Sequence, residues 1–158
     1  MRISIATISD SVSSGKSEDR SGPALIARCR ELGWRVVGTT VLADDQPAIE
    51  AFLKTAADSN DADILLTTGG TGLGPRDVTP EATMAVGDRL IPGFGEQMRA
   101  EGQKKTPRAI LSRATAAIRR KTIIINLPGS PRGAVESLDV LAQLLPHAVA
   151  VLQGARHE

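Results

Sequence analysis

The stretch Ile64-Leu-Leu-Thr-Thr-Gly-Gly-Thr-Gly-Leu-Gly-Pro-Arg-Asp-Val-Thr-Pro-Glu-Ala-Thr83 decides the fold of this chain. It begins with three consecutive apolar residues, as expected for a strand that is buried on both faces of a sheet. Four glycines within six positions follow, and glycine lets backbone N–H groups turn toward a ligand with no Cβ in the way. Thr79 and Pro80 suit an N-cap and a first helical residue, so a helix is predicted to begin there. A glycine loop that leads into a helix N-terminus favours anion binding, because unpaired N–H groups and the helix dipole attract negative charge.

Two charged residues lie between the glycine loop and the predicted helix. Arg76 is able to pair with a phosphate, whereas Asp77 repels one unless a divalent metal ion bridges the two groups. The loop lacks the P-loop pattern, because Pro75 and Arg76 follow Gly74, and it lacks the dinucleotide-binding pattern G-x-G-x-x-G. The alternative interpretation is a tight turn, with Asp77 as an ordinary acidic residue at the start of a helix.

The rest of the chain alternates between predicted strands and predicted helices. Such alternation indicates an α/β fold, a mostly parallel sheet that helices cover on both faces. Strands are predicted at residues 2–8, 34–42, 64–68 and 121–127. Helices are predicted from Ser21 as the cap to Gly33, from Pro47 after Asp45 or Gln46, from Pro80 to near Leu90, and from Pro131 after Ser130. Residues 94–108 are predicted to be irregular or helical in short pieces, and residues 110–118 are left unassigned.

Polar and glycine residues follow several of the predicted strands. Asp10, Asp44, residues 69–77 and residues 126–130 each come after a strand. Ligands of parallel sheets bind at the carboxyl ends of the strands, so we expect these segments to meet at one edge. For Asp44 the alternative is a solvated acid at a helix start.

Composition limits the classes of function. The 158 residues predict one domain, residues 1–158, with a core large enough to fold unaided. Aromatic residues are only 2% and the net charge is +1, which argues against nucleic acid and membrane partners. The single Cys29 fits a reducing compartment, and we see neither a signal peptide nor a membrane span, so a cytoplasmic protein is expected. His147 and His157 have no His or Cys neighbour at ligand spacing, so a zinc site is not expected.

From Thr67 to Thr83 the sequence closely resembles the Mog/MoaB family of molybdenum cofactor biosynthesis, which includes molybdopterin adenylyltransferases and the G domain of gephyrin. The match continues at residues 8–10, 18–22, 92–96, 110–113, 126–130 and 145–148, and so covers nearly the whole chain. The resemblance implies a three-layer α/β/α sandwich around a mixed sheet. It also implies assembly as a homotrimer.

The resemblance further implies a reaction in which molybdopterin and ATP give adenylyl-molybdopterin and pyrophosphate with the help of Mg2+. The two acids on which catalysis in the family relies match Asp44 and Asp77, which are expected to be both catalytic residues and metal ligands. Ala43 stands where a proline often precedes the first acid, but it removes no functional group. Residues implied in binding the pterin substrate are Gly69, Gly70, Thr71, Gly72, Ser112, Arg113, Asn126, Pro128, Gly129 and Ser130. Residues implied in binding the nucleotide are Ser9, Asp10, Asp19, Ser21 and Gly22.

The chemistry expected of such a site is in-line attack by the pterin phosphate on the α-phosphorus of ATP, which requires positioning and charge neutralisation. Asp44 and Asp77 would hold the metal ion, while the glycine-loop N–H groups and Arg113 would hold the phosphates. One alternative is a pterin-binding or scaffolding module of the same fold without transferase activity. Another is a nucleotide pyrophosphatase, because a related domain occurs in CinA-type proteins.

Overall fold

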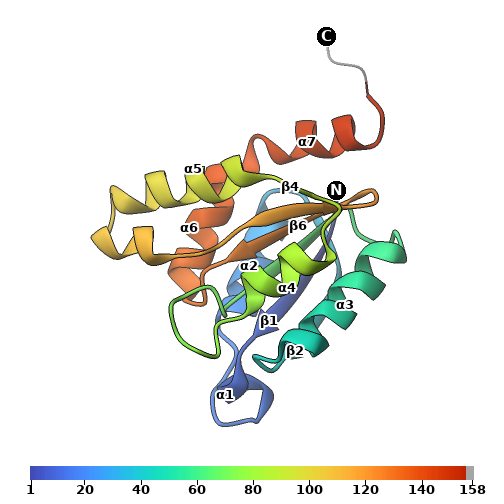
Figure 1. Ribbon diagram of the computed structural model, residues 1–158. Coiled ribbons are helices and arrows are strands. Elements are labelled where there is room, and N and C mark those ends of the chain that lie inside the picture. Colours follow the sequence, from blue (N-terminus) through green and yellow to red (C-terminus); the bar gives the residue numbers. More distant parts are fainter. Residues whose placement is uncertain (156–158) are drawn as a thin grey trace.

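A six-stranded mixed sheet lies at the centre of the computed structural model, which describes residues 1–155 (Figure 1). The strand order is β2-β1-β3-β6-β5-β4. The parallel strands are β1 (Arg2–Ile8), β2 (Arg35–Leu42), β3 (Ile64–Thr68) and β6 (Thr122–Leu127). The antiparallel strands at the other edge are β5 (Ala116–Arg119) and β4 (Arg89–Leu90). The predicted α/β class and the mostly parallel mixed sheet are confirmed.

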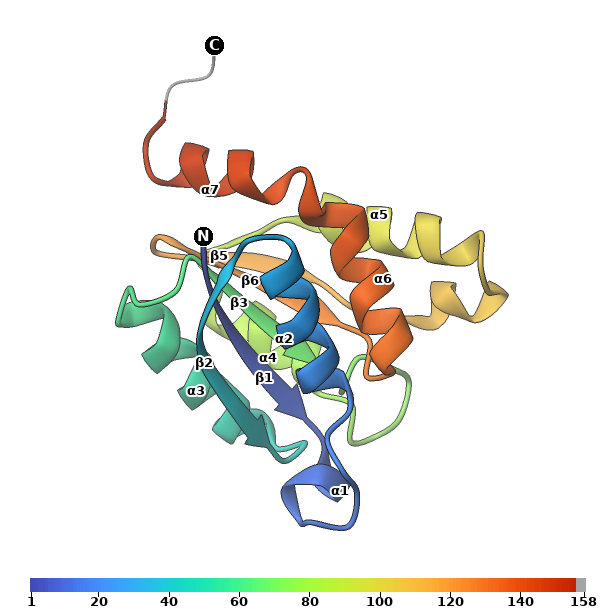
Figure 2. The same ribbon diagram turned by 180° about the vertical axis from the view of Figure 1, so that it is seen from behind.

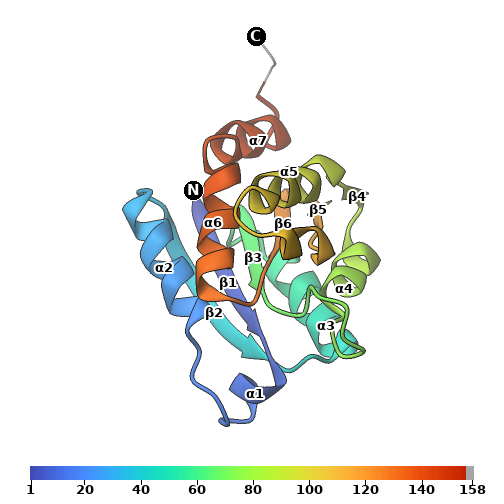
Figure 3. The ribbon, with the colours of Figure 1, turned by 90° about the vertical axis from the view of Figure 1, so that its left-hand side faces the viewer.

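Helices cover both faces of this sheet, as Figures 2 and 3 show from two further directions. Apolar side chains of β3 alternate between the two faces, with Ile64 and Leu66 in one buried cluster and Leu65 in the other. This explains why the strand is an unbroken apolar run. The first cluster receives side chains from α2 (Ser21–Glu31), α5 (Pro92–Gln103), α6 (Pro131–Ala142) and α7 (Leu145–Leu152). The second receives side chains from α3 (Gln46–Asp58) and α4 (Thr79–Val86).

Two predicted helix caps, Ser21 and Thr79, are wrong. Ser21 is the first residue of α2 and does not cap it; instead an Asp19 carboxylate oxygen accepts the N–H of Gly22 at 2.9 Å. Thr79 does not cap α4, because its hydroxyl donates to the carbonyl of Gly69 at 2.9 Å. Thr79 is able to cap a helix, but its tertiary contact with the glycine loop takes the place of the cap.

Three predicted boundaries also change. The polar loop after β1 contains one helical turn, α1 (Asp10–Ser13). Helix α4 ends at Val86 rather than near Leu90, because the chain there forms the short strand β4. In the segment predicted to be irregular or helical in short pieces, α5 is a long single helix, and the 3₁₀ helix η1 (Pro107–Leu111) begins at the end of that segment. The unassigned residues 110–118 contain the end of η1 and most of β5. By contrast, Asp45 and Ser130 cap α3 and α6 as predicted.

Within residues 1–155, no single helix has the length and apolar character needed to cross a membrane. Helices α6 and α7 reach the required length and composition only when taken together, and a bend of 62° separates them. Both contribute side chains to the buried cluster on one face of the sheet.

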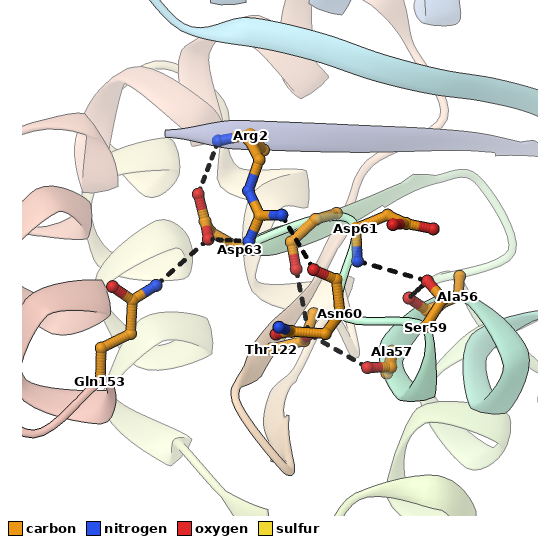
Figure 4. A network of polar contacts seen from close by, with 10 residues as sticks. Arg2, Ala56, Ala57, Ser59, Asn60, Asp61, Asp63, Thr122 and Gln153 are labelled. Carbon is orange, nitrogen blue, oxygen red and sulfur yellow. Dashed lines mark hydrogen bonds and ion pairs between the residues drawn. The ribbon is translucent and has the colours of Figure 1, made fainter.

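Asp63 organises a polar network at the edge where the parallel strands begin (Figure 4). Its carboxylate accepts the backbone N–H of Arg2 at 2.7 Å, the Arg2 guanidinium at 2.8 Å and the side-chain amide of Gln153 at 3.1 Å. Burial raises the pKa of the Asp63 carboxyl, but the hydrogen bonds from Arg2 outweigh burial and the pKa is lowered. The network joins the first strand to the segment that follows α7.

Asp63→Asn is expected to lower the free energy of unfolding by about 2 kcal/mol, the usual scale for hydrogen bonds to a buried charged group. Because the folded-state pKa is lowered, ionised Asp63 stabilises the fold above its unfolded pKa, and this contribution is lost as the pH falls through the folded value. Urea unfolding at neutral pH and at about pH 3 measures both effects. The exposed Asp61→Asn variant is the control. Equal stability of Asp63→Asn and the wild type at neutral pH would contradict this role.

Candidate functional site

The carboxyl ends of the parallel strands meet at one edge of the sheet, opposite the Asp63 network. Thr7 of β1 pairs with Thr68 of β3, which in turn pairs with Leu127 of β6. The segments that leave these strands are joined by backbone hydrogen bonds, from Gly69 N to Leu127 O at 3.1 Å and from Ser9 N to Leu42 O at 2.8 Å. The prediction that these segments gather at one edge is confirmed.

The glycine loop after β3 packs closely against the segments that end the neighbouring strands, through backbone atoms at Gly69 and side-chain atoms at Gly70. Gly69 has φ of +103° and Gly70 has φ of +65°, a region that favours glycine. A Cβ on Gly69 would lie 2.2 Å from the carbonyl oxygen of Ile8, and a Cβ on Gly70 would lie 3.0 Å from Asp44 Oδ1. The first two glycines therefore allow the loop to lie directly against the ends of β1 and β2.

Asp77 is held within the same loop by its neighbours. Its Oδ2 accepts the N–H of Gly74 at 2.9 Å, and its own N–H donates to the carbonyl of Gly74 at 3.0 Å. A Cβ on Gly72 or Gly74 would lie 2.8 or 2.9 Å from this carboxylate oxygen. The later glycines thus make the space in which the carboxylate sits.

Asp44 and Asp10 bind each other reciprocally after β2 and β1. Asp44 Oδ2 accepts the N–H of Asp10 at 2.9 Å, and Asp10 Oδ1 accepts the N–H of Asp44 at 3.0 Å. Arg76 adds a bidentate contact to the Asp10 carboxylate, at 2.9 and 3.0 Å. The hydrogen bond from the Arg76 guanidinium lowers the pKa of Asp10. Arg76 therefore links the glycine loop to the loop that follows β1.

The second carboxylate oxygen of Asp44, Oδ1, is buried and has no hydrogen-bond partner in the described structure. Burial is the main reason that the pKa of Asp44 is raised, and the negative charges of Asp10 and Asp77 add to the effect. An unpartnered carboxylate oxygen in this position has an unmet need for a donor or a cation. Among residues 1–155, no group of three or more His, Cys, Asp or Glu side chains forms a metal site by itself.

Asp44→Asn is expected to stabilise the protein by about 0.5–1 kcal/mol, within the range of single stabilising substitutions. A raised folded-state pKa contributes stability at low pH that is lost as the pH rises through that value, so ionised Asp44 disfavours folding at neutral pH. Thermal unfolding with and without the substitution measures the effect. The neighbouring Asp45→Asn is the matched control, because asparagine caps a helix as well as aspartate. A lower melting temperature for Asp44→Asn would contradict the assignment.

Two cavities lie on either side of the loop of residues 128–131. The rim cavity, of about 420 Å3, is at the strand ends and is lined by Gly69, Gly70, Asp44 and Asp77 together with the start of α2. The helix cavity, of about 480 Å3, lies between α5, η1 and α6. Pro128 and Ser130 line the helix cavity, whereas Gly129 and Pro131 line the rim cavity. The loop is therefore shared between the two cavities.

Most residues predicted to form the site line one of the two cavities. The rim cavity has Ser9, Asp19, Ser21, Asp44, Gly69, Gly70, Asp77 and Gly129. The helix cavity has Ser112, Pro128 and Ser130. The others, which line neither of these cavities, are Asp10, Gly22, Thr71, Gly72, Arg113 and Asn126.

The residues that line neither cavity have contacts within the fold. Asn126 is fully buried, and its side-chain amide donates to the hydroxyls of Thr67 at 3.0 Å and Thr83 at 2.8 Å. Arg113 contacts carbonyl oxygens of the glycine loop. His147 lies in α7, and His157 lies outside the described residues.

Sequence reasoning missed polar residues that shape both cavities. Thr7 donates from its hydroxyl to Asp19 Oδ2 at 2.7 Å, and Thr68 donates to the carbonyl of Pro128 at 2.7 Å. The sequence feature that could have indicated both residues is a threonine at the carboxyl end of an apolar strand. Lys105, which follows the end of α5, forms an ion pair with Glu136 at 3.1 Å beside the helix cavity.

Known proteins resemble this chain in sequence and in fold. The family model described as a probable molybdopterin binding domain matches residues 4–147. The molybdopterin adenylyltransferase of Haemophilus influenzae is 43% identical over 88% of this chain and 72% of that protein. The molybdopterin adenylyltransferase of Helicobacter pylori strain J99 is 40% identical over 98% of this chain and 89% of that protein. The crystal structure of the molybdopterin biosynthesis enzyme MoaB of Thermus thermophilus is 42% identical, with a TM-score of 0.91 over 99% of both chains.

Proposed function

The chain belongs to the family of probable molybdopterin binding domains, and we propose that it is a molybdopterin adenylyltransferase of molybdenum cofactor biosynthesis. In this reaction AMP is transferred from ATP to the phosphate of molybdopterin, and pyrophosphate is released. The observation that carries the proposal is the composition of the rim cavity. Asp44, Asp77 and the first two glycines of the loop line one cavity, although they come from separate segments of the chain.

The two cavities support a division of the substrates. Three of the residues implied in nucleotide binding, Ser9, Asp19 and Ser21, line the rim cavity. Of those implied in pterin binding, Ser112, Pro128 and Ser130 line the helix cavity, whereas Gly69, Gly70 and Gly129 line the rim cavity, where the pterin phosphate would meet ATP. We therefore place ATP in the rim cavity and the pterin in the helix cavity, so that the reacting groups meet at the shared loop.

The proposed step is an in-line displacement at the α-phosphorus of ATP. A phosphate oxygen of molybdopterin forms the new bond to this phosphorus, and the bond to the oxygen that bridges to the β-phosphate breaks, so pyrophosphate leaves with that electron pair. The protein supplies little covalent chemistry and contributes position and charge neutralisation. Backbone N–H groups of the glycine loop and of the shared loop are the donors best placed to receive phosphate oxygens.

The residues present fit a magnesium ion. Asp44 Oδ1 is buried without a hydrogen-bond partner, and Asp77 lines the same cavity. Mg2+ takes oxygen ligands and is usually held by one or two carboxylates plus substrate phosphates, so a complete ligand set within the protein is not required. Bound there, Mg2+ would neutralise charge on the phosphates during transfer. Asp44 and Asp77 are the residues that would hold it.

Pyrophosphate release tests the proposal. The protein is incubated anaerobically with ATP and Mg2+, with and without molybdopterin, and pyrophosphate is measured. We expect release that depends on the pterin. Pterin binding without release would indicate a binding or scaffolding module, and release without the pterin would indicate a nucleotide pyrophosphatase.

The homotrimer implied by the resemblance is part of the proposal. Leu73, Ile110 and Leu111 are large apolar side chains with 67%, 54% and 50% of their surface exposed, and such side chains are common in subunit interfaces. Analytical ultracentrifugation should find a particle of three chains. A monomer at micromolar concentration would contradict this part.

A further inference from the structure

The Arg113 side chain is directed into the curve of the glycine loop. Its Nε donates to the carbonyl of Gly72 at 2.7 Å, and its Nη2 donates to the carbonyl of Asp77 at 2.6 Å. Its backbone N–H donates to the carbonyl of Thr71 at 2.8 Å. One residue that follows η1 therefore binds three separate carbonyls of the loop that carries Asp77.

Glu81, in the first turn of α4, also binds the Arg113 guanidinium. Its two carboxylate oxygens accept from Arg113 Nη1 and, at 3.3 Å, from Arg113 Nη2. The hydrogen bond from Arg113 lowers the pKa of Glu81, so the carboxylate is ionised at neutral pH. Neither Arg113 nor Glu81 lines the rim cavity or the helix cavity. The pair thus lies outside the two cavities assigned to the substrates.

We propose that Arg113, oriented by Glu81, is a positioning residue of the adenylyl transfer: it fixes the glycine loop and thereby the Asp77 carboxylate. It does not itself bind substrate phosphate. This inference rests on the proposed function, and it assigns Arg113 a role other than the pterin contact that the family resemblance implies. Glu81 acquires a role that the resemblance does not assign.

The donor count supports the positioning role. A guanidinium has five N–H donors, and four hydrogen bonds from Arg113 to the loop and to Glu81 are already present. One N–H of Nη1 remains, so a bidentate contact to a phosphate would require Arg113 to release Gly72, Asp77 or Glu81. The planar, preorganised guanidinium suits a site that needs several acceptors held at fixed positions.

The loop needs such support because of its own composition. Residues 69–74 include four glycines, which carry no side chain to pack and have large backbone freedom in the absence of other contacts. Asp77 is held within the loop by Gly74, itself part of the same segment. A displacement of about 1 Å at a reacting group costs on the order of 100-fold in rate. Arg76 already links the loop to Asp10, and Arg113 adds the external contact that binds the carbonyl of Asp77 itself.

The kinetic test uses Arg113→Lys and Glu81→Gln in the assay of pyrophosphate release. Lysine keeps the positive charge but provides one nitrogen in place of three, so kcat is expected to fall about 10–100-fold. The KM for molybdopterin is expected to stay within about 3-fold, because no substrate contact is lost. Glu81→Gln is expected to lower kcat by about 3–10-fold, also with little change in KM. Arg119→Lys is the matched control, since Arg119 contacts both Asp58 and the carbonyl of Val86 at the opposite edge of the sheet.

A positioning role and a phosphate-binding role of Arg113 predict opposite changes in kcat and KM. If Arg113 bound the pterin phosphate, Arg113→Lys would raise KM, and Glu81→Gln would free the guanidinium and lower KM. A change in the KM for molybdopterin of more than 10-fold in either variant, with kcat preserved, would overturn the proposal. Hydrogen–deuterium exchange of residues 71–78 provides a readout that is independent of activity: both variants should exchange faster there, and Arg119→Lys should not. Unchanged exchange would overturn the proposal even if the wild type showed no turnover, whereas absent wild-type turnover alone would count against the proposed function.

Discussion

Asp77→Asn is expected to lower kcat for adenylyl transfer by at least about 100-fold, equivalent to about 2.7 kcal/mol of transition-state stabilisation. Asparagine keeps the shape of the side chain and an oxygen that can still accept the N–H of Gly74. The loop should therefore keep its conformation. What is removed is the negative charge beside Asp44 in the rim cavity, which the proposal assigns to the metal ion.

Binding and folding separate this effect from general damage. Molybdopterin affinity, measured by fluorescence or calorimetry, should stay within about 3-fold, because the pterin is assigned to the helix cavity on the other side of the shared loop. The melting temperature should change little. Loss of pterin binding, or turnover near that of the wild type, would contradict the role given to Asp77.

Gly69→Ala is expected to destabilise the protein by about 3–5 kcal/mol, because about 1–3 kcal/mol for overpacking adds to about 1–3 kcal/mol for backbone strain. The added Cβ would lie 2.2 Å from the carbonyl oxygen of Ile8, which is fixed as the last residue of β1. The φ of +103° at this position adds backbone strain for any residue other than glycine. Urea unfolding measures the loss.

Gly33→Ala is the matched control for this substitution. Gly33 also has a positive φ, +75°, but a Cβ there would meet nothing within 4 Å. Gly33→Ala should lower the free energy of unfolding by about 1 kcal/mol, which is the backbone contribution alone. Similar losses for the two variants would show that strain alone accounts for the effect, and that the close approach of the glycine loop to β1 is unimportant.

The central part of the fold was predictable because local signals and tertiary packing agree there. The apolar run of β3 predicts a strand buried on both faces, and both buried clusters contain its side chains. Prediction was poorest from Pro92 to Arg119, where α5, η1 and β5 have few distinctive sequence signals. Gly93 and Gly95 disfavour a helix locally, but α5 packs through Met98 against the first cluster, and tertiary packing prevails.

For the site, sequence reasoning was able to indicate which segments meet but not how each side chain is used. Asp44 and Asp77 line one cavity because both follow parallel strands, which topology alone predicts. The contacts of Arg113 with Gly72, Asp77 and Glu81 depend on where the segment after η1 crosses the glycine loop. Periodicity carries no information about such a crossing. The helix cavity was also missed, because α5 forms one of its walls and was not predicted as a single helix.

The most direct test of the central claim follows the α-phosphate of ATP. The protein is incubated anaerobically with ATP labelled at the α-phosphorus, Mg2+ and molybdopterin, and the products are separated. We expect the label to move to the pterin as adenylyl-molybdopterin, and Asp77→Asn to abolish this transfer. Label recovered only as free AMP, or remaining in ATP while the pterin is bound, would contradict the proposed function.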